Sequence, residues 1–203
     1  MNAFELRVHS NLHGETSCVV DFAAFLKGRR LFPCGDGCDY RLFKKDIQQV
    51  YSKIRKCGRD TYAALESKHT KEVHEFPMAF AFDTQQFEEA MRKLGLDPSD
   101  TDKVCSFDGG GLVRRSDAGR FREMFARHDK ERQDAIDGDP TGDGYIYGMF
   151  YHQLNNHEYT YTYDAEDTLN SLNLSWDKVN GNPKLLHGLN AAMEALKNAD
   201  SFG

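Results

Sequence analysis

Residues 78 to 125 place a strand, a helix, a hairpin and a second helix in close succession, and this order constrains the fold most strongly. The segment 78–82 alternates as a strand does, with Met78, Phe80 and Phe82 on one face. Asp83 is a helix-capping residue, and Gln86 completes the pattern of a capping box. The helix that follows is expected to end at Gly95 and to carry these apolar residues on one side: Phe87, Ala90, Met91 and Leu94.

The segment 104–115 predicts a β-hairpin, because a glycine-rich turn at 108–111 separates two short apolar runs. A helix is expected to begin at Ser116 or Asp117 and to face inward through Phe121, Met124, Phe125 and His128. These elements predict an α+β fold, in which a small, mostly antiparallel sheet is packed by amphipathic helices.

Upstream, residues 4–9 alternate as a half-buried strand. A helix follows with Phe43, Ile47, Val50, Tyr51 and Ile54 on one face, and Gly58 is expected to stop it. A second helical piece ends in a polar segment closed by Pro77. We therefore expect an N-terminal region of a strand and a basic helix at 1–75 and an α+β domain at 76–203, either as two parts or as one continuous fold.

Downstream, four features complete the predicted order of elements. A helix places Ile146, Met149, Phe150 and Leu154 at helical spacing, and the run 159–163 alternates tyrosine with threonine, which favours a strand. Asp164 caps a short helix, and Asn182–Pro183 opens the last one, because proline suits the first helical position. The last helix should bury Leu185, Leu189, Ala192, Met193 and Leu196.

Charge is distributed unevenly along the 203 residues. Net charge is −6 overall, from 26 Lys and Arg against 32 Asp and Glu. Residues 1–75 carry 13 basic and 10 acidic side chains, and residues 76–203 carry 13 and 22. The acidic part disfavours general nucleic-acid binding, since phosphate contacts need cations, whereas the basic part leaves it open locally.

The cysteine count and the apolar runs indicate a compartment. Five irregularly spaced cysteines favour reduced thiols over a disulfide framework. No apolar run approaches the ~18 residues of a membrane span, and the start shows no basic region followed by an apolar stretch. We expect a cytoplasmic protein that does not enter a membrane.

The segment 137–147, DGDPTGDGYIY, resembles a calcium loop in its spacing of acidic residues and glycines. Such a loop needs oxygen ligands at alternating positions and a bidentate glutamate at position 12. A loop that begins at Asp137 uses Asp139 and Asp143 but has Gly148 at position 12, and one that begins at Asp139 has Phe150 there. Because neither has the closing carboxylate, we expect an acidic interhelical turn without tight calcium binding.

Other metal or catalytic patterns are incomplete. Cys34 and Cys38 form a glycine-containing knuckle that suits zinc, but no second ligand pair has a recognised spacing. His152 and His157 are five residues apart, and Glu158 follows the second of them, so the spacing of a zinc-protease helix is absent.

Two further patterns lack the residues that chemistry requires. The glycines at 109–111 have no following Lys-Ser or Lys-Thr to hold a phosphate, and no serine or cysteine lies in a nucleophile motif. An enzyme or metal-binding protein that uses His152, His157, Glu158 or the acidic loop at 137–143 remains the alternative, with zinc or calcium as its metal.

Two surfaces suit a macromolecular partner. The basic helix carries cations off its apolar stripe, and the tyrosine run offers aromatic area with polar tips. Either surface is also consistent with a solvated helix face or ordinary sheet packing. The candidate partner-binding residues are Lys44, Lys45, Lys53, Arg55, Lys56, Arg59, Tyr159, Tyr161 and Tyr163.

The runs FAFDTQQFEEAMRKLGL and DGYIYGMFYHQLNNHEYTYTYDAEDTLNSLNL resemble short proteins of unassigned function carried by phages and conjugative elements of gut bacteria. The resemblance covers about residues 76–200. It implies a bacterial or phage-infected cytoplasm and an accessory, anti-defence role in which such a protein binds a host factor. Together with the charge asymmetry, it leads us to expect a non-enzymatic protein that binds a protein partner or a nucleoprotein complex.

Overall fold

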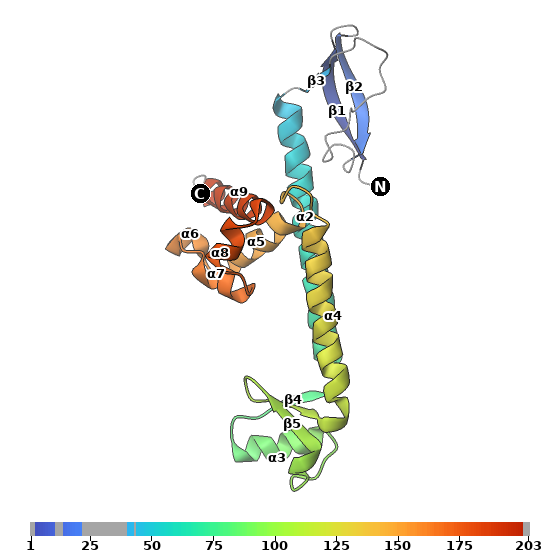
Figure 1. Cartoon of the computed structure of the whole chain (residues 1–203), viewed down its shortest axis with the longest axis vertical. Helices are drawn as coiled ribbons and strands as arrows, with labels where there is room; N and C mark the ends of the chain where they lie inside the picture. The colour runs from blue at the N-terminus through green and yellow to red at the C-terminus, as the bar shows by residue number, and fades with distance from the viewer. Residues whose placement is uncertain (1–2, 11–13, 22–39, 43, 201–203) are drawn as a thin grey trace. The chain divides into compact units, whose positions relative to one another are not determined.

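The computed structural model describes residues 3–10, 14–21, 40–42 and 44–200 (Figure 1). Its contacts divide the chain into two compact units, one made of residues 1–64 with 135–203 and the other of residues 65–134. Pro77, the boundary expected from the sequence, lies inside the second unit. The expected α+β class is confirmed, since the described residues form helices and two small sheets in which every described strand pair is antiparallel.

The first sheet contains three strands in the order β2-β1-β3. Strand β1 (Ala3–Ser10) pairs along its whole length with β2 (Gly14–Asp21) and over its last residues with β3 (Tyr40–Leu42). The strand expected at 4–9 is therefore confirmed, whereas β2 and β3 carried no signal that we recognised.

Helix α2 (Lys44–Glu75) runs without interruption through Gly58, so the expected stop at that residue is wrong. A Cβ atom at Gly58 would come 2.0 Å from the carbonyl oxygen of Gly144. The glycine therefore permits a close backbone approach and does not end the helix. Val50 and Ile54 of the expected apolar stripe are buried, and Tyr51 is at its edge with 36% of its surface exposed.

The second unit contains the sheet β4-β6-β5 and helix α3 (Thr84–Lys93). Strand β4 (Met78–Phe80) pairs with β6 (Gly111–Arg114), which forms the expected hairpin with β5 (Val104–Phe107). The Asp83 carboxylate accepts the Gln86 N–H at 2.8 Å, which confirms the predicted cap of α3. Short 3₁₀ turns at Thr101–Lys103 and Arg115–Asp117 precede β5 and α4 (Ala118–Asp137).

The core of this sheet includes Ala79 of β4, and Ala81, just after that strand, packs against it. Ala79 and Ala81 pack with Met91 and Leu94 of α3, whereas Phe80 and Phe82 are 54% and 78% exposed. The strand alternates as expected, but its smaller residues face the helix.

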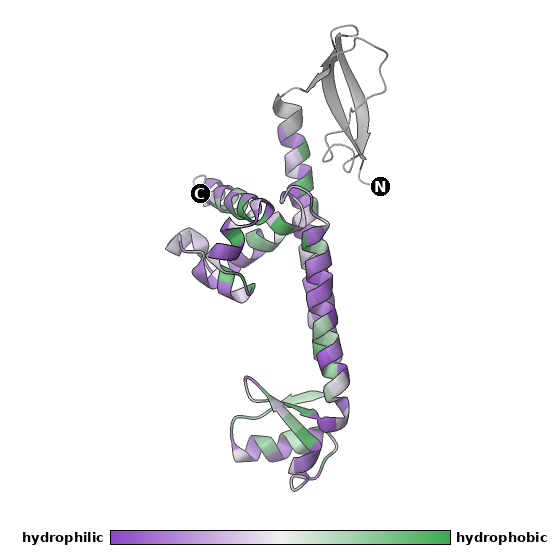
Figure 2. Cartoon of the chain, in the orientation of Figure 1, coloured by the Kyte–Doolittle hydropathy of each residue, from purple (hydrophilic) through white to green (hydrophobic). Residues whose placement is uncertain are grey.

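Five helices follow in the first unit. They are α5 (Tyr145–Asn156), α6 (Tyr159–Thr162), α7 (Glu166–Ser171), α8 (Trp176–Asn180) and α9 (Pro183–Asp200). Helices α5 and α9 are on average more hydrophobic than α4, which is largely hydrophilic in Figure 2. The Asn182 side chain accepts the Lys184 N–H at 3.1 Å, which confirms the predicted start of α9.

The strand expected at 159–163 is wrong, because residues 159–162 form the single turn α6 and Tyr163 caps its end. Glu158 and Tyr163 flank that turn in the left-handed region, with φ values of 52° and 54°. The two left-handed residues reverse the chain on either side of the turn, so an extended path is not available.

No helix among the residues that the structure describes is both long and apolar enough to cross a membrane.

Candidate partner-binding groove

The acidic loop between α4 and α5 is organised by the buried carboxylate of Asp139. Oδ1 accepts the backbone N–H groups of Thr141 and Gly142 at 3.2 and 2.9 Å. Oδ2 accepts those of Gly144 and Ile146, both at 3.0 Å. Oδ2 thereby satisfies amide groups at the start of α5 that have no acceptor within the helix, and Oδ1 satisfies two amides of the loop before it.

Asp143 has a different set of partners, drawn from α2 and α9. Arg55 donates from Nε and Nη2 to Oδ1 at 3.0 and 2.9 Å, and Nε2 of His187 lies 2.9 Å from Oδ2. The Asp143 side chain is 3% exposed, compared with 30% for Arg55 and 49% for His187. The loop carboxylates are thus bonded to protein donors, and Asp143 joins residues that are far apart in the sequence.

Glycines allow the elements around this loop to approach closely. A Cβ atom at Gly148 would lie 2.3 Å from the carbonyl oxygen of Gly58, and one at Gly188 would lie 2.6 Å from Cγ2 of Ile146. Gly142 has a φ of 87°, and a Cβ atom there would lie 2.2 Å from the carbonyl oxygen of Lys184. These approaches hold α5 against α2 and α9 at backbone distance.

Beside the Arg55–Asp143 pair lies a cavity of about 480 Å³, which we call the α2–α5 groove. Its lining comes from two helices, and consists of Gln48, Tyr51, Ser52, Arg55, Arg59 and Tyr147. Tyr147 is buried, whereas Gln48, Tyr51 and Ser52 are exposed. The groove therefore combines an aromatic ring and two guanidinium groups with an open polar rim.

Both arginines lie over tyrosine rings of α5. The Arg55 Cζ atom is 5.2 Å from the centroid of the Tyr147 ring, and the Arg59 Cζ atom is 4.8 Å from that of Tyr151. Burial raises the pKa of the Tyr147 phenol, whereas the charges of Arg59 and Arg55 and a hydrogen bond from the Arg59 side chain act in the opposite direction. Stacking of this kind fixes the plane of a guanidinium and leaves its N–H edge available for hydrogen bonds.

Arg59 differs from Arg55 in that no carboxylate among the described residues lies within ion-pair distance of it. Lys56, on the same helix, pairs with Asp60 at 2.6 Å, and Lys53 is exposed. Of the six basic residues predicted as a partner surface, the structure brings Arg55 and Arg59 together in one groove. Lys44 and Lys45 lie in the first turn of α2, where side chains are outside the described part.

The predicted tyrosine surface is divided by the α6 turn. Tyr159 is buried at 3% exposure, whereas Tyr161 and Tyr163 are 85% and 59% exposed. Lys197 of α9 lies over the rings of both Tyr159 and Tyr163, at 5.8 and 5.6 Å from their centroids. The three residues do not form a continuous aromatic row.

The residues considered for a metal are dispersed. Cys34 and Cys38 lie outside the described residues, and Asp137 is the exposed last residue of α4. The His152 ring packs near Tyr62, His157 ends α5, and the Glu158 side chain is exposed. Within the described ranges, no group of three or more His, Cys, Asp or Glu side chains could hold a metal ion.

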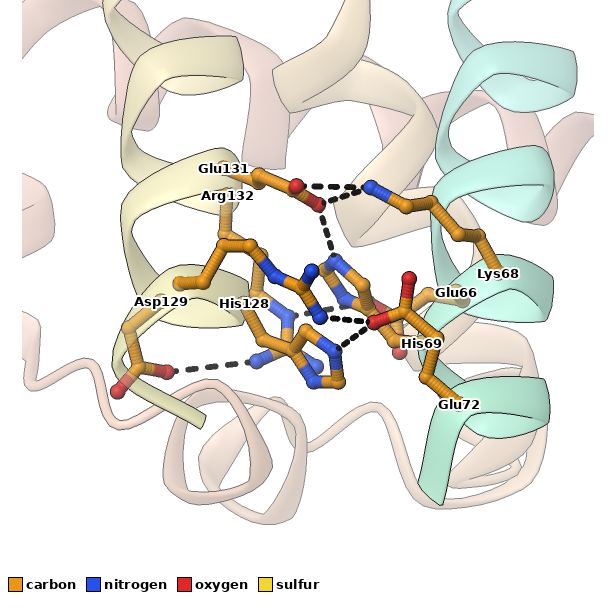
Figure 3. Close-up of polar contacts among 9 residues, drawn as sticks. Glu66, Lys68, His69, Glu72, His128, Asp129, Glu131 and Arg132 are labelled. Carbon is orange, nitrogen blue, oxygen red and sulfur yellow. Dashed lines mark hydrogen bonds and ion pairs between the residues drawn. The ribbon is translucent and has the colours of Figure 1, made fainter. Parts of the chain in front are cut away.

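A second polar cluster lies in the other unit, between α2 and α4 (Figure 3). The buried rings of His69 and His128 stack with centroids 3.9 Å apart. Nε2 of His69 lies 2.8 Å from Glu131, and Nε2 of His128 lies 2.7 Å from Glu72. Because each imidazole is directed at a different carboxylate, the cluster ties the two helices together and is not arranged around a common centre.

Lysine and arginine complete this cluster. Lys68 bonds both oxygens of Glu131, at 2.7 and 2.8 Å, and Arg127 bonds Glu72. Hydrogen bonds from Lys68 and then His69 lower the pKa of Glu131 from 4.5 to about 2. The hydrogen bond from His128 likewise lowers the pKa of Glu72.

Sequence reasoning missed His187, Tyr147 and Tyr151. His187 lies 44 residues from Asp143, so no local spacing links the two. Tyr147 and Tyr151 are four residues apart and thus share one helix face, and Arg55 and Arg59 have the same spacing on another helix. The two matching spacings could have indicated that the arginines lie against the tyrosines.

A family model described as a family of unknown function (DUF7659) matches residues 61–195 of the chain. No curated protein and no solved structure matches the chain.

Proposed function

The chain belongs to this family of unknown function, and we propose that it acts as a binding protein that holds a macromolecular partner at the α2–α5 groove. The single observation that carries the proposal is the position of the Arg59 side chain in this groove. Its guanidinium lies over the Tyr151 ring, its side chain lines the groove, and it has no carboxylate partner among the described residues.

An oriented arginine at an open groove suits recognition better than it suits stability. Its planar fork can donate two parallel hydrogen bonds to one anionic group, and arginine and tyrosine are both enriched at binding interfaces. Arg59 is half-buried and forms no ion pair with a described carboxylate, so its charge is not needed to neutralise a buried acid in the way that the charge of Arg55 neutralises Asp143.

The resemblance to accessory proteins of phages and mobile elements supports a host or defence protein as the partner. Such a partner would be met in the cytoplasm. In this proposal the chain performs no chemistry, and its effect comes from occupying a surface of the partner.

Site-specific photo-crosslinking tests the proposal. A photoreactive amino acid replaces the exposed groove residue Ser52 in the full chain, and the protein is irradiated in an extract of the cells in which it occurs. We expect one defined adduct with a macromolecule, and we expect Arg59→Gln to reduce its yield.

The control places the same photoreactive group at Lys130, which is exposed on α4 in the other unit. Adducts that are identical from both positions, or that persist with Arg59→Gln, would refute binding at the groove. A thermal melt of each variant shows whether the fold is retained.

A further inference from the structure

We infer that the α2–α5 groove takes an acidic segment of a protein, with a carboxylate side chain held by Arg59 and an adjacent apolar or aromatic side chain against Tyr51. This inference rests on the proposed function and specifies the chemistry of the partner. It concerns an Asp- or Glu-containing peptide segment and not a nucleic acid.

The number of available cations favours a short acidic segment. Arg55 and Arg59 are the basic residues of the groove lining, and Arg55 already gives two hydrogen bonds to Asp143. Lys56, one turn away, is paired with Asp60. A protein that binds duplex DNA commonly neutralises about 6–10 phosphates. The described groove offers one arginine without a carboxylate and a second that is shared, which matches one or two carboxylates.

The charges around the groove also oppose a long polyanion. Asp60 lies on the same helix, and Asp143 is bonded to Arg55. A nucleic acid strand would extend its phosphates past these carboxylates, whereas a peptide can present a single acidic side chain between them. The net charge of −6 over the whole chain acts in the same direction.

The geometry of the arginines suits a planar carboxylate. The Arg59 Cζ atom lies 4.8 Å from the centroid of the Tyr151 ring, and the Arg59 side chain hydrogen-bonds the Tyr147 phenol, so two neighbours position the guanidinium before a ligand arrives. A carboxylate can accept two of these N–H groups in the bidentate arrangement. Lysine at this position would keep the charge but lose the fork.

The rim of the groove indicates what flanks the carboxylate. Tyr51 is 36% exposed, and its ring centroid lies 5.9 Å from the Arg55 guanidinium. Its exposed ring offers apolar area to a neighbouring side chain, and Gln48 and Ser52 offer polar groups to the peptide backbone. A segment that alternates acidic and aromatic residues would satisfy both features.

Fluorescence anisotropy with three labelled probes tests the inference on the full chain. The probes are a short peptide of alternating glutamate and phenylalanine, the same peptide with glutamine in place of glutamate, and a single-stranded oligothymidylate of equal charge. At low salt we expect the glutamate peptide to bind about 10-fold more tightly than the glutamine peptide, because a charge-assisted hydrogen bond is lost in the latter. We expect the oligothymidylate to bind more weakly than the glutamate peptide.

Variants connect this binding to the groove. Arg59→Gln should weaken the glutamate peptide about 10-fold, and Arg59→Lys should have a smaller effect because it keeps the charge. The matched control is Arg92→Gln on α3, where the arginine is exposed and bonded to Glu88. Retained affinity of Arg59→Gln, or a tighter complex with the oligothymidylate, would overturn the inference.

The crosslinking and anisotropy experiments distinguish failure of this inference from failure of the proposed function. An adduct at Ser52 that depends on Arg59 but contains nucleic acid, or a glutamate peptide that does not bind, would overturn the acidic-segment inference and leave the groove as a binding site. An absence of any Arg59-dependent adduct would overturn the proposed function itself.

Discussion

Replacing Asp139 should destabilise the fold strongly, because one carboxylate satisfies four backbone amides. Among these amides, the hydrogen bonds from Gly142 and Ile146 are buried, whereas those from Thr141 and Gly144 are partly buried. A buried N–H left without an acceptor costs about 1–3 kcal/mol. Water can reach the partly buried pair, so the buried pair sets the magnitude. We expect Asp139→Ala to lower the free energy of unfolding by about 2–6 kcal/mol.

The variant Asp139→Asn tests the contributions of the two carboxylate oxygens separately. Oδ1 serves Thr141 and Gly142, and Oδ2 serves Gly144 and Ile146, so an asparagine can satisfy one pair with its single oxygen. Its NH₂ group then faces the other pair, which contains one buried amide whichever way the side chain turns. The expected loss is about half that of the alanine variant, or about 1–3 kcal/mol.

Urea unfolding followed by circular dichroism measures both losses, provided that the slope of the transition is unchanged. Asp134→Ala is the matched control, since this side chain is exposed and pairs with Lys130 one turn earlier. An exposed pair of this kind contributes at most about 0.5 kcal/mol. If both Asp139 variants unfolded like the control, the four amide bonds would not stabilise the loop, and our account of it would be wrong.

Three further predictions follow from the loop, the helix crossing and the polar cluster. Calorimetry should detect no tight calcium binding at 137–148, because Asp139 and Asp143 are bonded to protein donors and the twelfth position of the loop lacks a carboxylate. A calcium site that Asp143→Ala removes would refute this prediction. Gly58→Ala should destabilise the protein by about 1–3 kcal/mol in thermal or urea unfolding, because the added Cβ atom would lie 2.0 Å from the carbonyl oxygen of Gly144. We expect this loss even though alanine has the better helix propensity. Unchanged stability would contradict the close approach of the two glycines. The pKa of Glu131 is lowered from 4.5 to about 2, so its contribution to stability should be present above pH 4.5 and lost as the pH falls toward 2. Unfolding free energies measured across that range should therefore fall less steeply for Glu131→Gln than for the unchanged protein. An equal fall in both proteins would show that Glu131 is not the group responsible.

The elements that the sequence predicted well are those whose signals are local. The cap at Asp83, the hairpin around the glycine turn and the start of α9 at Pro183 each depend on a few adjacent residues. Their energetics are decided within one turn of the chain, so a single sequence contains the necessary information.

The elements that were predicted wrongly depend on distant partners. Gly58 has the composition of a helix stop, but the helix continues because the glycine lies against Gly144, which is 86 positions further along. Phe80 and Phe82 are more hydrophobic than the alanines beside them, yet the space below α3 is filled by Ala79 and Ala81. Residue hydrophobicity alone cannot predict the size of a space that another helix creates.

The candidate site was predicted only in part for the same reason. Arg55 and Arg59 were recognised as cations on a helix, and Asp143 as a residue of an acidic loop. The bond between Arg55 and Asp143 joins residues 88 apart, and no local pattern distinguishes such a pair from two solvated charges. Arg55 was consequently expected to be exposed for a partner, whereas its side chain is largely occupied by Asp143.

Arg55 and Arg59 contribute differently to the groove, and this difference decides which variants can test binding. Removing Arg55 would leave the Asp143 carboxylate buried with His187 as its remaining side-chain partner, so loss of binding in that variant would be confounded by loss of stability. Arg59 forms no ion pair with a carboxylate in the described structure, and its replacement changes the groove with less effect on the core.

The family match begins at residue 61 and therefore includes Asp139, Asp143 and His187 but neither arginine. The loop is thus within the part that the family model describes, whereas the proposed binding depends on residues that precede it and has to be tested on this chain.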